Sequence, residues 1–332
     1  MGSKVSGTDG ASQPAFDIDS GVSIRKLSLL SDMEMREPSL KDIFYSHSLL
    51  SSALFPSSEP AEDVEFVSKT NGALEYVLEA GVDPVTKRRR FPYGKYPRLI
   101  MTWIAKQIRS AGGRRTQYVD PETHTITIPS IWRLCEDMGI PHGGSTDGKL
   151  QEQLYRLLSC RISIRRSTGV GFKGRRVHDT VYMPLVEAVR MVADENRAQF
   201  SGAAFVLTEE VYRRLARESA PFDMRAATYL LSGRSVLPYD LYVWLAGSMK
   251  ELRHDLPVKW DWLYDRFGRG QCSMRRFRRV FRAGLEKVRD VYPGLRVTVG
   301  RDVVVLHPSP TPISPRRGGR ASSEDVELGE FG

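Results

Sequence analysis

The chain has 332 residues, enough for two ordinary domains, and its 41% hydrophobic content excludes a wholly disordered protein. Its formal net charge of +9 is unevenly distributed, because residues 1–86 are acidic and residues 87–310 are strongly basic. A cationic folded part favours a polyanionic partner, nucleic acid first and an anionic membrane second.

The chain shows no signal for membrane insertion or export. It contains no apolar run of about eighteen residues, and its N-terminal region has no apolar core. Cys135, Cys160 and Cys272 are too far apart for a disulfide framework or a zinc site. We therefore expect a cytoplasmic protein with reduced cysteines and no membrane partner.

The two ends of the chain differ from its middle in composition. Residues 1–86 are rich in Ser, Asp, Glu and Gly, which predicts an acidic and largely flexible N-terminal arm. The basic run at 87–90 marks the start of the ordered part. Because prolines recur from residue 307 onward, we expect the fold to stop near residue 310 and residues 311–332 to form a disordered tail.

Residues 87–202 show the order helix, helix, helix, hairpin. Ser130 is a candidate N-cap for the second helix, and Gly139 a candidate C-cap. The predicted elements are a helix at 96–112, an extended piece at 124–129, a helix from 131 to Gly139, a turn at 141–148, a helix at 149–160, and a hairpin formed by 161–166 and 175–189.

The same order recurs in residues 203–310, after a bridging segment and a short helix near 223–231. The predicted elements are helices at 237–254, 257–268 and 274–288, followed by a hairpin at 295–308. We therefore predict a mostly α protein with small β-hairpins, an α+β fold of tandem winged-helix domains at 87–202 and 203–310.

Arginines are concentrated in the third helix of the second copy. At 100° per residue, one contiguous stripe of this helix is apolar and contains Phe277, Val280, Phe281, Leu285 and Val288. Arg275, Arg279 and Arg282 fall on the opposite side, with Arg276 at its margin. Since the helix after the turn of a helix-turn-helix enters the major groove, we predict that these four arginines bind DNA. Arg301, in the hairpin turn, is predicted to contact the DNA backbone or a minor groove.

The first copy is a weaker candidate for reading bases. Its third helix is predicted to present a mixed surface with Lys149, Gln153 and Arg156. Its hairpin loop carries three further candidate phosphate contacts, Lys173, Arg175 and Arg176. We expect this copy to contact the DNA backbone and to be a candidate surface for homodimer formation.

Motifs for catalysis, metals or cofactors are incomplete. Residues 143–150 approach a P-loop, but Leu150 stands where Ser or Thr must bind magnesium. The six histidines form no HEXXH motif or adjacent pair, so an origin-nicking enzyme lacks its expected ligands. We expect no enzymatic activity, cofactor or metal. RNA binding is an alternative without an RNP-like or KH-like motif to support it.

Several segments resemble the plasmid-encoded RepA replication initiators. They are FPYGKYPRLIMTWI (91–104), LLSCRISI (157–164), LPYDLYVWLAGSM (237–249) and FRRVFRAGLEKVRDVYPGLRVTV (277–299). The resemblance extends over about residues 90–310 and leaves the acidic arm outside. It implies a bacterial, plasmid-associated initiator that binds repeated double-stranded DNA sites at the origin, promotes local melting, and recruits host replication proteins such as a helicase or initiator. A transcriptional repressor or copy-control protein built on the same module is the alternative.

Overall fold

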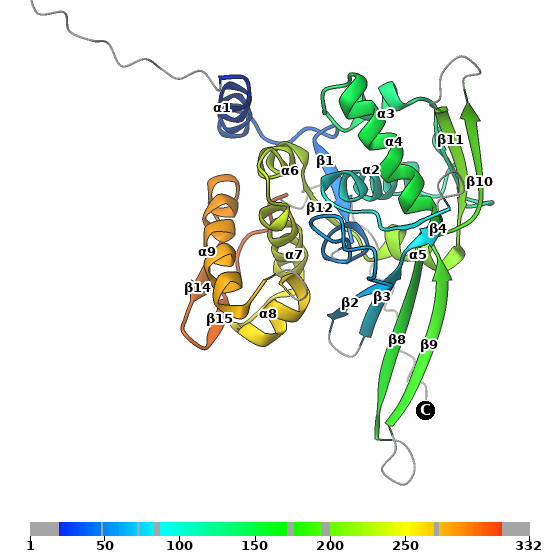
Figure 1. The fold of residues 1–332 in the computed structure, drawn as a ribbon. Helices are drawn as coiled ribbons and strands as arrows, with labels where there is room; N and C mark the ends of the chain where they lie inside the picture. Colours follow the sequence, from blue (N-terminus) through cyan, green and yellow to red (C-terminus); the bar gives the residue numbers. More distant parts are fainter. Residues whose placement is uncertain are drawn as a thin grey trace, which may run out of the picture.

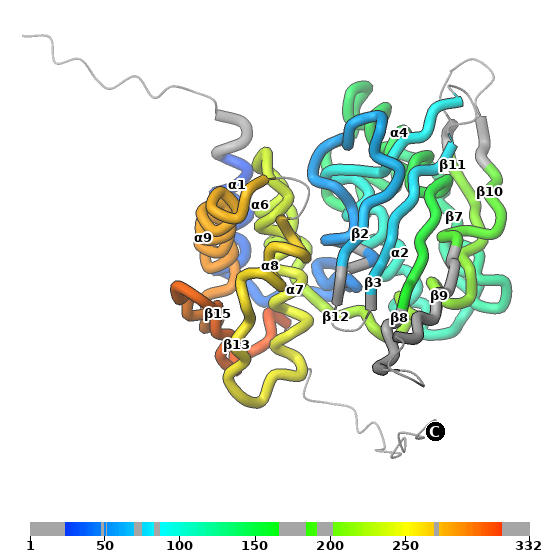
Figure 2. Tube along the Cα trace, turned by 60° about the horizontal axis from the view of Figure 1, so that its bottom comes forward, coloured from blue at the N-terminus to red at the C-terminus, as the bar shows by residue number. Residues whose placement is uncertain are grey.

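Two groups of helices and antiparallel strands lie side by side in the computed structural model (Figure 1). The structure describes residues 20–47, 49–71, 74–82, 87–170, 176–193, 200–268 and 272–313. The first part contains α2 to α5 and most of the strands, and the second contains α6 to α9 with β13 to β15 (Figure 2). The predicted mixture of helices and small antiparallel β structures is confirmed, although the strands are more extensive than two hairpins.

In the first part, helix α2 (Lys95–Ala111) is buried along most of its length and packs against α4 and α5. The other helices of this part are α3 (Ile131–Asp137), α4 (Gly144–Ser159) and α5 (Glu209–Arg217). The predicted N-cap of α3 is confirmed, since the Ser130 side chain accepts a hydrogen bond from the Arg133 amide. The C-cap is Met138 rather than Gly139, which follows it in the left-handed region with a φ of 62°. Helix α4 begins five residues earlier than predicted.

Two four-stranded sheets complete the first part. One has the order β2 (Phe66–Asn71), β3 (Leu74–Glu79), β8 (Arg161–Val170) and β9 (Arg176–Pro184). The other has the order β10 (Val186–Ala193), β11 (Phe200–Leu207), β7 (Thr125–Ile128) and β6 (Val119–Asp120). Short strands β4 (Gly81–Val82) and β5 (Arg89–Arg90) pair beside them.

The predicted domain boundary between residues 202 and 203 falls inside β11. This strand pairs with β10 and β7, so it belongs to the first part. Gly202 is required at this point, because an added Cβ would lie 2.6 Å from the Pro129 carbonyl oxygen. The sequence contains no composition change at this position that would have shown the error.

The prediction of a largely flexible arm at 1–86 is wrong for the described residues from 20 onward. They form α1 (Ser20–Met35), β1 (Ile43–Ser46), the π-helical turn η1 (Leu49–Ala53), and strands β2 to β4. Strand β1 pairs with β12 (Ala220–Asp223), and β3 pairs with β8. Strands β1 and β3 were misjudged because they make backbone hydrogen bonds with strands distant in sequence, which local composition cannot reveal.

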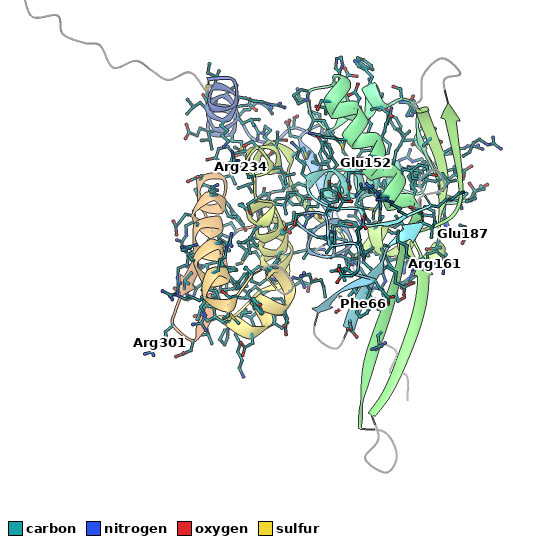
Figure 3. The ribbon with its side chains drawn as sticks, viewed as in Figure 1. Phe66, Glu152, Arg161, Glu187, Arg234 and Arg301 are labelled. Atoms are coloured by element: carbon teal, nitrogen blue, oxygen red, sulfur yellow. The ribbon has the colours of Figure 1, made fainter. Side chains whose placement is uncertain are left out.

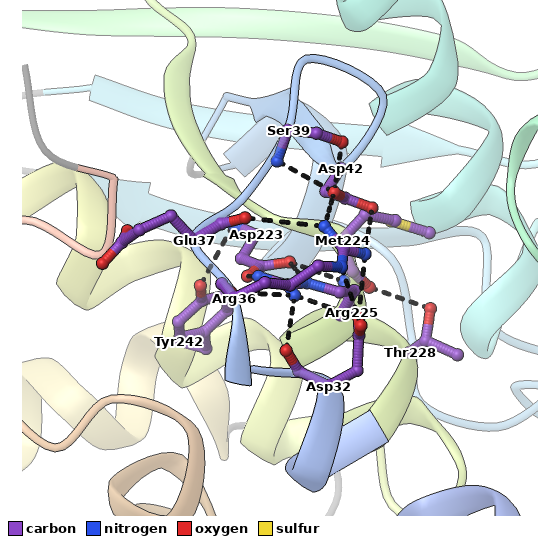
Figure 4. Close-up of polar contacts among 10 residues, drawn as sticks. All are labelled: Asp32, Arg36, Glu37, Ser39, Asp42, Asp223, Met224, Arg225, Thr228 and Tyr242. Atoms are coloured by element: carbon purple, nitrogen blue, oxygen red, sulfur yellow. Dashed lines mark hydrogen bonds and ion pairs between the residues drawn. The ribbon is translucent and has the colours of Figure 1, made fainter. Parts of the chain in front are cut away.

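Ion pairs join α1 to the rest of the protein (Figure 4). Arg36 pairs with Asp32 at 2.7 Å and with Asp42 at 2.6 Å, while Arg225 pairs with Asp223 at 2.7 Å and with Asp32 at 3.0 Å. Burial alone would raise the pKa of Asp42, but hydrogen bonds from Arg36 and Ser39 outweigh it and hold this pKa well below its usual range. The Asp42 carboxylate therefore stays charged and keeps Arg36 in place.

The second part follows the predicted order of elements. It contains α6 (Met224–Leu231), α7 (Leu237–Glu251), α8 (Trp260–Phe267) and α9 (Met274–Val291), then β14 (Val297–Val299) and β15 (Val303–Leu306). An additional strand, β13 (Leu256–Lys259), occupies the start of the predicted second helix and gives a sheet of order β13-β15-β14.

A buried ion pair connects the two parts through α2 and α7. Arg98 and Asp240 form two hydrogen bonds of 2.8 Å each, and both residues are almost completely buried. Arg98 also donates to the carbonyl oxygens of Phe55 and Gly94, at 2.8 and 2.7 Å. The hydroxyl groups of Thr102 and Tyr239 lie 2.8 Å apart. The Arg98–Asp240 and Thr102–Tyr239 contacts fix α7 against α2, and the two backbone acceptors hold the Arg98 side chain in place.

Lys69 on β2 is only 2% exposed, and its burial should affect stability in a pH-dependent way. Desolvation lowers its pKa from 10.5 to about 8, although Asp240 and Asp265 oppose the shift. At pH 7 the folded protein holds a buried ammonium group that the unfolded chain solvates. The unfolded chain binds more protons between pH 8 and 10.5, so this cost disappears as the pH rises.

Lys69→Met is therefore expected to raise the free energy of unfolding at pH 7, by on the order of 3 kcal/mol at most. The advantage over the parent protein should shrink between about pH 8 and pH 10. Urea unfolding of both proteins across this range provides the measurement, with the exposed Lys287→Met as the control. An advantage that does not change with pH would contradict the assignment.

Candidate nucleic-acid interface

Helix α9 begins where the sequence provides a cap and ends after 18 residues. The Ser273 side chain accepts a hydrogen bond from the Arg276 amide, which satisfies one of the free N–H groups of the first turn. The apolar and basic residues that follow alternate with helical period, so the helix has one apolar side and one cationic side.

The apolar side of α9 packs on α8 through aromatic rings. Phe277 and Phe281 are at most 1% exposed, and both contact the ring of Trp260 edge to face, at centroid distances of 6.3 and 5.3 Å. The ring of Tyr264 lies 5.6 Å from Phe277. Edge-to-face pairs of this kind have defined geometry, and they fix the rotation of α9 about its own axis.

The opposite side of α9 carries the predicted arginines. Arg275, Arg276, Arg279 and Arg282, the arginine face, are all exposed. None of the four forms an ion pair with a carboxylate of the described residues. Because cations close together repel one another, a surface of this kind is stabilised by an anionic ligand. The prediction that these side chains point away from the protein is confirmed.

Arg278 has a different place from its neighbours. It is partly buried, and its guanidinium lies over the Trp260 ring at 5.1 Å, beside that of Arg282 at 5.4 Å. A guanidinium that stacks on an indole loses less freedom when it binds, since the ring already restricts it. Trp260 therefore supports both the apolar and the basic side of α9.

The hairpin turn lies beside the first turns of α9. Arg301 is exposed at the outer end of the β14–β15 hairpin, as Figure 3 shows. The Trp260 indole donates a hydrogen bond to the Gly300 carbonyl oxygen at 3.3 Å, and Arg289 donates to the Val297 carbonyl oxygen at 2.8 Å. Arg275, Arg282 and Arg301 consequently line one surface groove. No sequence signal indicated that Trp260 contacts the hairpin.

In the first part, Lys149 is exposed on α4 but Arg156 is not. The prediction that Arg156 and Gln153 lie on an outward surface is wrong, because they are 2% and 3% exposed. Arg156 pairs with Glu59 at 2.7 Å and with Glu152 at 2.5 Å. Glu59 belongs to the N-terminal segment that the sequence had left outside the fold, so its contact with α4 was not foreseeable.

The remaining predicted contacts of the first part stay untested. Lys173 and Arg175 lie outside the described residues, and Arg176 is described only as the first residue of β9. In the part of the chain that the structure describes, no helix has the length and apolar character needed to cross a bilayer. The same residues contain no group of three or more His, Cys, Asp and Glu side chains that could hold a metal ion.

Helix α8, the arginine-bearing helix α9 and the β14–β15 hairpin follow one another in the chain. The chain belongs to the family of plasmid-encoded RepA proteins, which residues 91–261 match. This match runs from before α2 to the first turn of α8, so the arginine face lies beyond the matched residues. Membership of this family supports a role in the initiation of replication.

Two solved structures of RctB are similar to this chain. The crystal structure of RctB domains 2-3 has 12% sequence identity and a TM-score of 0.45, covering 78% of this chain and 94% of that one. The selenomethionine derivative of RctB domains 2 and 3 has 11% identity and a TM-score of 0.49, covering 79% and 99%. No curated protein sequence matches the chain.

Proposed function

We propose that the protein is a plasmid replication initiator that binds repeated double-stranded DNA sites at the origin and reads their sequence. It acts in the bacterial cytoplasm without catalytic activity, promotes opening of the origin and recruits host replication proteins. The observation that carries the proposal is the arginine face, which is exposed, free of ion pairs with described carboxylates, and fixed in orientation by an aromatic contact with α8.

The second part acts as a winged-helix domain in this proposal. Helix α9 enters the major groove with its N-terminal turns closest to the bases, where an arginine fork can bind guanine O6 and N7 together. The hairpin carries Arg301 to the adjacent backbone or minor groove. The strand order β13-β15-β14 supports a winged-helix domain. Strand β13 pairs with the hairpin strand β15 and leads directly into α8, so it connects the hairpin to helices α8 and α9.

The first part acts as a second winged-helix domain, with α3 and α4 as its helix pair and β8 and β9 as its hairpin. Exposed Lys149 contacts phosphate without choosing a base. Homodimer formation through this part remains a prediction. The arginine face implies binding that weakens steeply as salt concentration rises.

Arg279→Ala tests base reading. We expect affinity for the cognate site to fall by about 5- to 150-fold, the range that corresponds to the loss of one bidentate arginine–guanine contact. Affinity for a scrambled duplex should change far less. Fluorescence anisotropy at one fixed salt concentration measures both, and Lys287→Ala, an exposed cation farther along α9, is the control. Equal losses of affinity for the cognate and the scrambled duplex would show that Arg279 does not read a base.

A transcriptional repressor or copy-control protein would use the same surface, so the geometry of DNA binding cannot separate it from an initiator. A plasmid that carries only the cognate repeats, with the protein supplied in trans, makes the distinction. Replication of this plasmid is the expected result. Tight binding to the repeats without replication would favour the repressor.

A further inference from the structure

A cavity of about 860 Å³ lies between the two parts of the protein. One wall comes from the end of β1 and the connection between α5 and β12, and the other comes from α7, β13 and α8. Its volume lies within the range of small-molecule sites, and such sites occur preferentially where two parts of a fold meet. No residue of the arginine face lines it.

Indole rings and aliphatic side chains form the inner surface of the cavity. Trp244 and Trp262 have ring centroids 5.7 Å apart and inclined at 40°, and Leu256 and Val258 lie beside them. Trp262 is partly exposed, and Leu256 is 44% exposed, which is high for a leucine in a folded protein. A flat aromatic ligand would bury this surface efficiently.

Two buried polar side chains contribute to the same walls. The Ser219 hydroxyl is in a residue only 3% exposed and has no hydrogen-bond partner among the described residues. Such groups are rare, because an unsatisfied buried hydroxyl costs free energy that a ligand can recover. Arg266 is 1% exposed, and its guanidinium lies 5.2 Å from the Trp262 ring centroid. Burial lowers its pKa to about 10, which still leaves it charged at neutral pH.

The rim of the cavity is cationic. Arg217, Lys250 and Lys259 are exposed there and form no ion pair with a described carboxylate. Of the two glutamates in the lining, Glu218 is engaged with His47 at 3.1 Å and with Arg214 at 3.2 Å. The charge that remains available to a ligand is therefore mainly positive, and it favours an anion.

We propose that this cavity binds a nucleoside phosphate, with the base against Trp262 and the phosphate beside Lys259 and Arg266. Nucleotides combine a flat ring with concentrated negative charge. The aromatic inner surface of the cavity complements the ring, and its cationic rim complements the charge. The nucleotide is either free or part of a single DNA strand, since both present the same chemistry. This site goes beyond the proposed function and does not depend on it.

Isothermal titration of the full chain with ATP tests the free nucleotide, and titration with a short single-stranded oligonucleotide tests the strand. We expect saturable binding of at least one probe. Trp262→Ala should weaken it by about fivefold or more, as expected for loss of a stacking partner. Trp262→Phe should retain most of it, because a ring remains in place.

Matched controls separate the cavity from the rest of the surface. Trp132→Ala removes a tryptophan that is 51% exposed on α3, outside the cavity, and should leave binding unchanged. Lys259→Gln should weaken binding more than Lys287→Gln does. Binding of the oligonucleotide alone, lost in Trp262→Ala, would assign the site to a single strand. Failure of both probes to bind at millimolar concentration, or binding that follows Arg275→Gln rather than Trp262→Ala, would overturn the proposal.

Discussion

Replacement of Asp240 by alanine is expected to lower the free energy of unfolding by about 3–5 kcal/mol. The substitution would leave the Arg98 guanidinium, which is 1% exposed, without its only carboxylate partner among the described residues. The remaining acceptors are backbone carbonyl oxygens of Phe55, Pro56 and Gly94, and they carry no full negative charge. A buried cation without a counter-charge is among the most destabilising results of a single substitution.

Urea unfolding monitored by circular dichroism measures this effect. Asp290→Ala is the control, because Asp290 is exposed and should change stability by less than about 0.5 kcal/mol. The double variant Arg98→Met/Asp240→Leu should recover much of the loss, since it removes both charges together. A loss below about 1 kcal/mol in Asp240→Ala would show that solvent reaches the pair.

Phe281→Ala is expected to destabilise the protein by a similar amount, about 3–5 kcal/mol, because the removed ring is 1% exposed and packs on Trp260 and Phe277. The loss should also affect DNA binding. The Trp260 indole donates a hydrogen bond to the Gly300 carbonyl oxygen and stacks with the guanidinium groups of Arg278 and Arg282. A cavity beside Trp260 would therefore loosen the hairpin and the arginine face together.

Thermal unfolding and DNA binding at low temperature separate the two effects of Phe281→Ala. Val280→Ala, one residue earlier and only partly buried, provides a control with a smaller cost. If the folded fraction of Phe281→Ala bound cognate DNA as tightly as the parent protein, the aromatic contact would stabilise the fold without orienting the arginines.

Local patterns predicted the second part well. The period of Phe277, Phe281 and Leu285 against Arg275 and Arg279 fixes both the helix and its exposed side, because the two sets are separated in a single amphipathic element. Gly300 to Asp302 likewise form a turn whose residues are adjacent in sequence, closed by a hydrogen bond from the Gly300 amide to Val303. Both features could be predicted because the residues that determine them lie close together in the sequence.

Features that depend on distant partners could not be predicted. Arg156 carries the same charge as Lys149 and lies two turns along the same helix, yet it is buried because Glu59 and Glu152 neutralise it. The acidic composition of residues 1–86 indicated flexibility, whereas Glu59 and Glu62 in that segment form ion pairs with arginines of the first part. Composition gives the average character of a segment, whereas these ion pairs depend on which individual residues meet in the folded protein.

Strand β1 has a consequence for the order in which this protein acquires its structure during synthesis. Ile43 pairs with Asp223, so β1 is made early but cannot find its hydrogen-bonding partner until most of the chain has left the ribosome. Pairings between such distant segments form slowly, because the entropy of closing a long loop is lost before the contacts that compensate it can form. In the meantime the nascent chain carries an open strand edge that other chains can join, and rapid translation at high concentration would favour that misassembly.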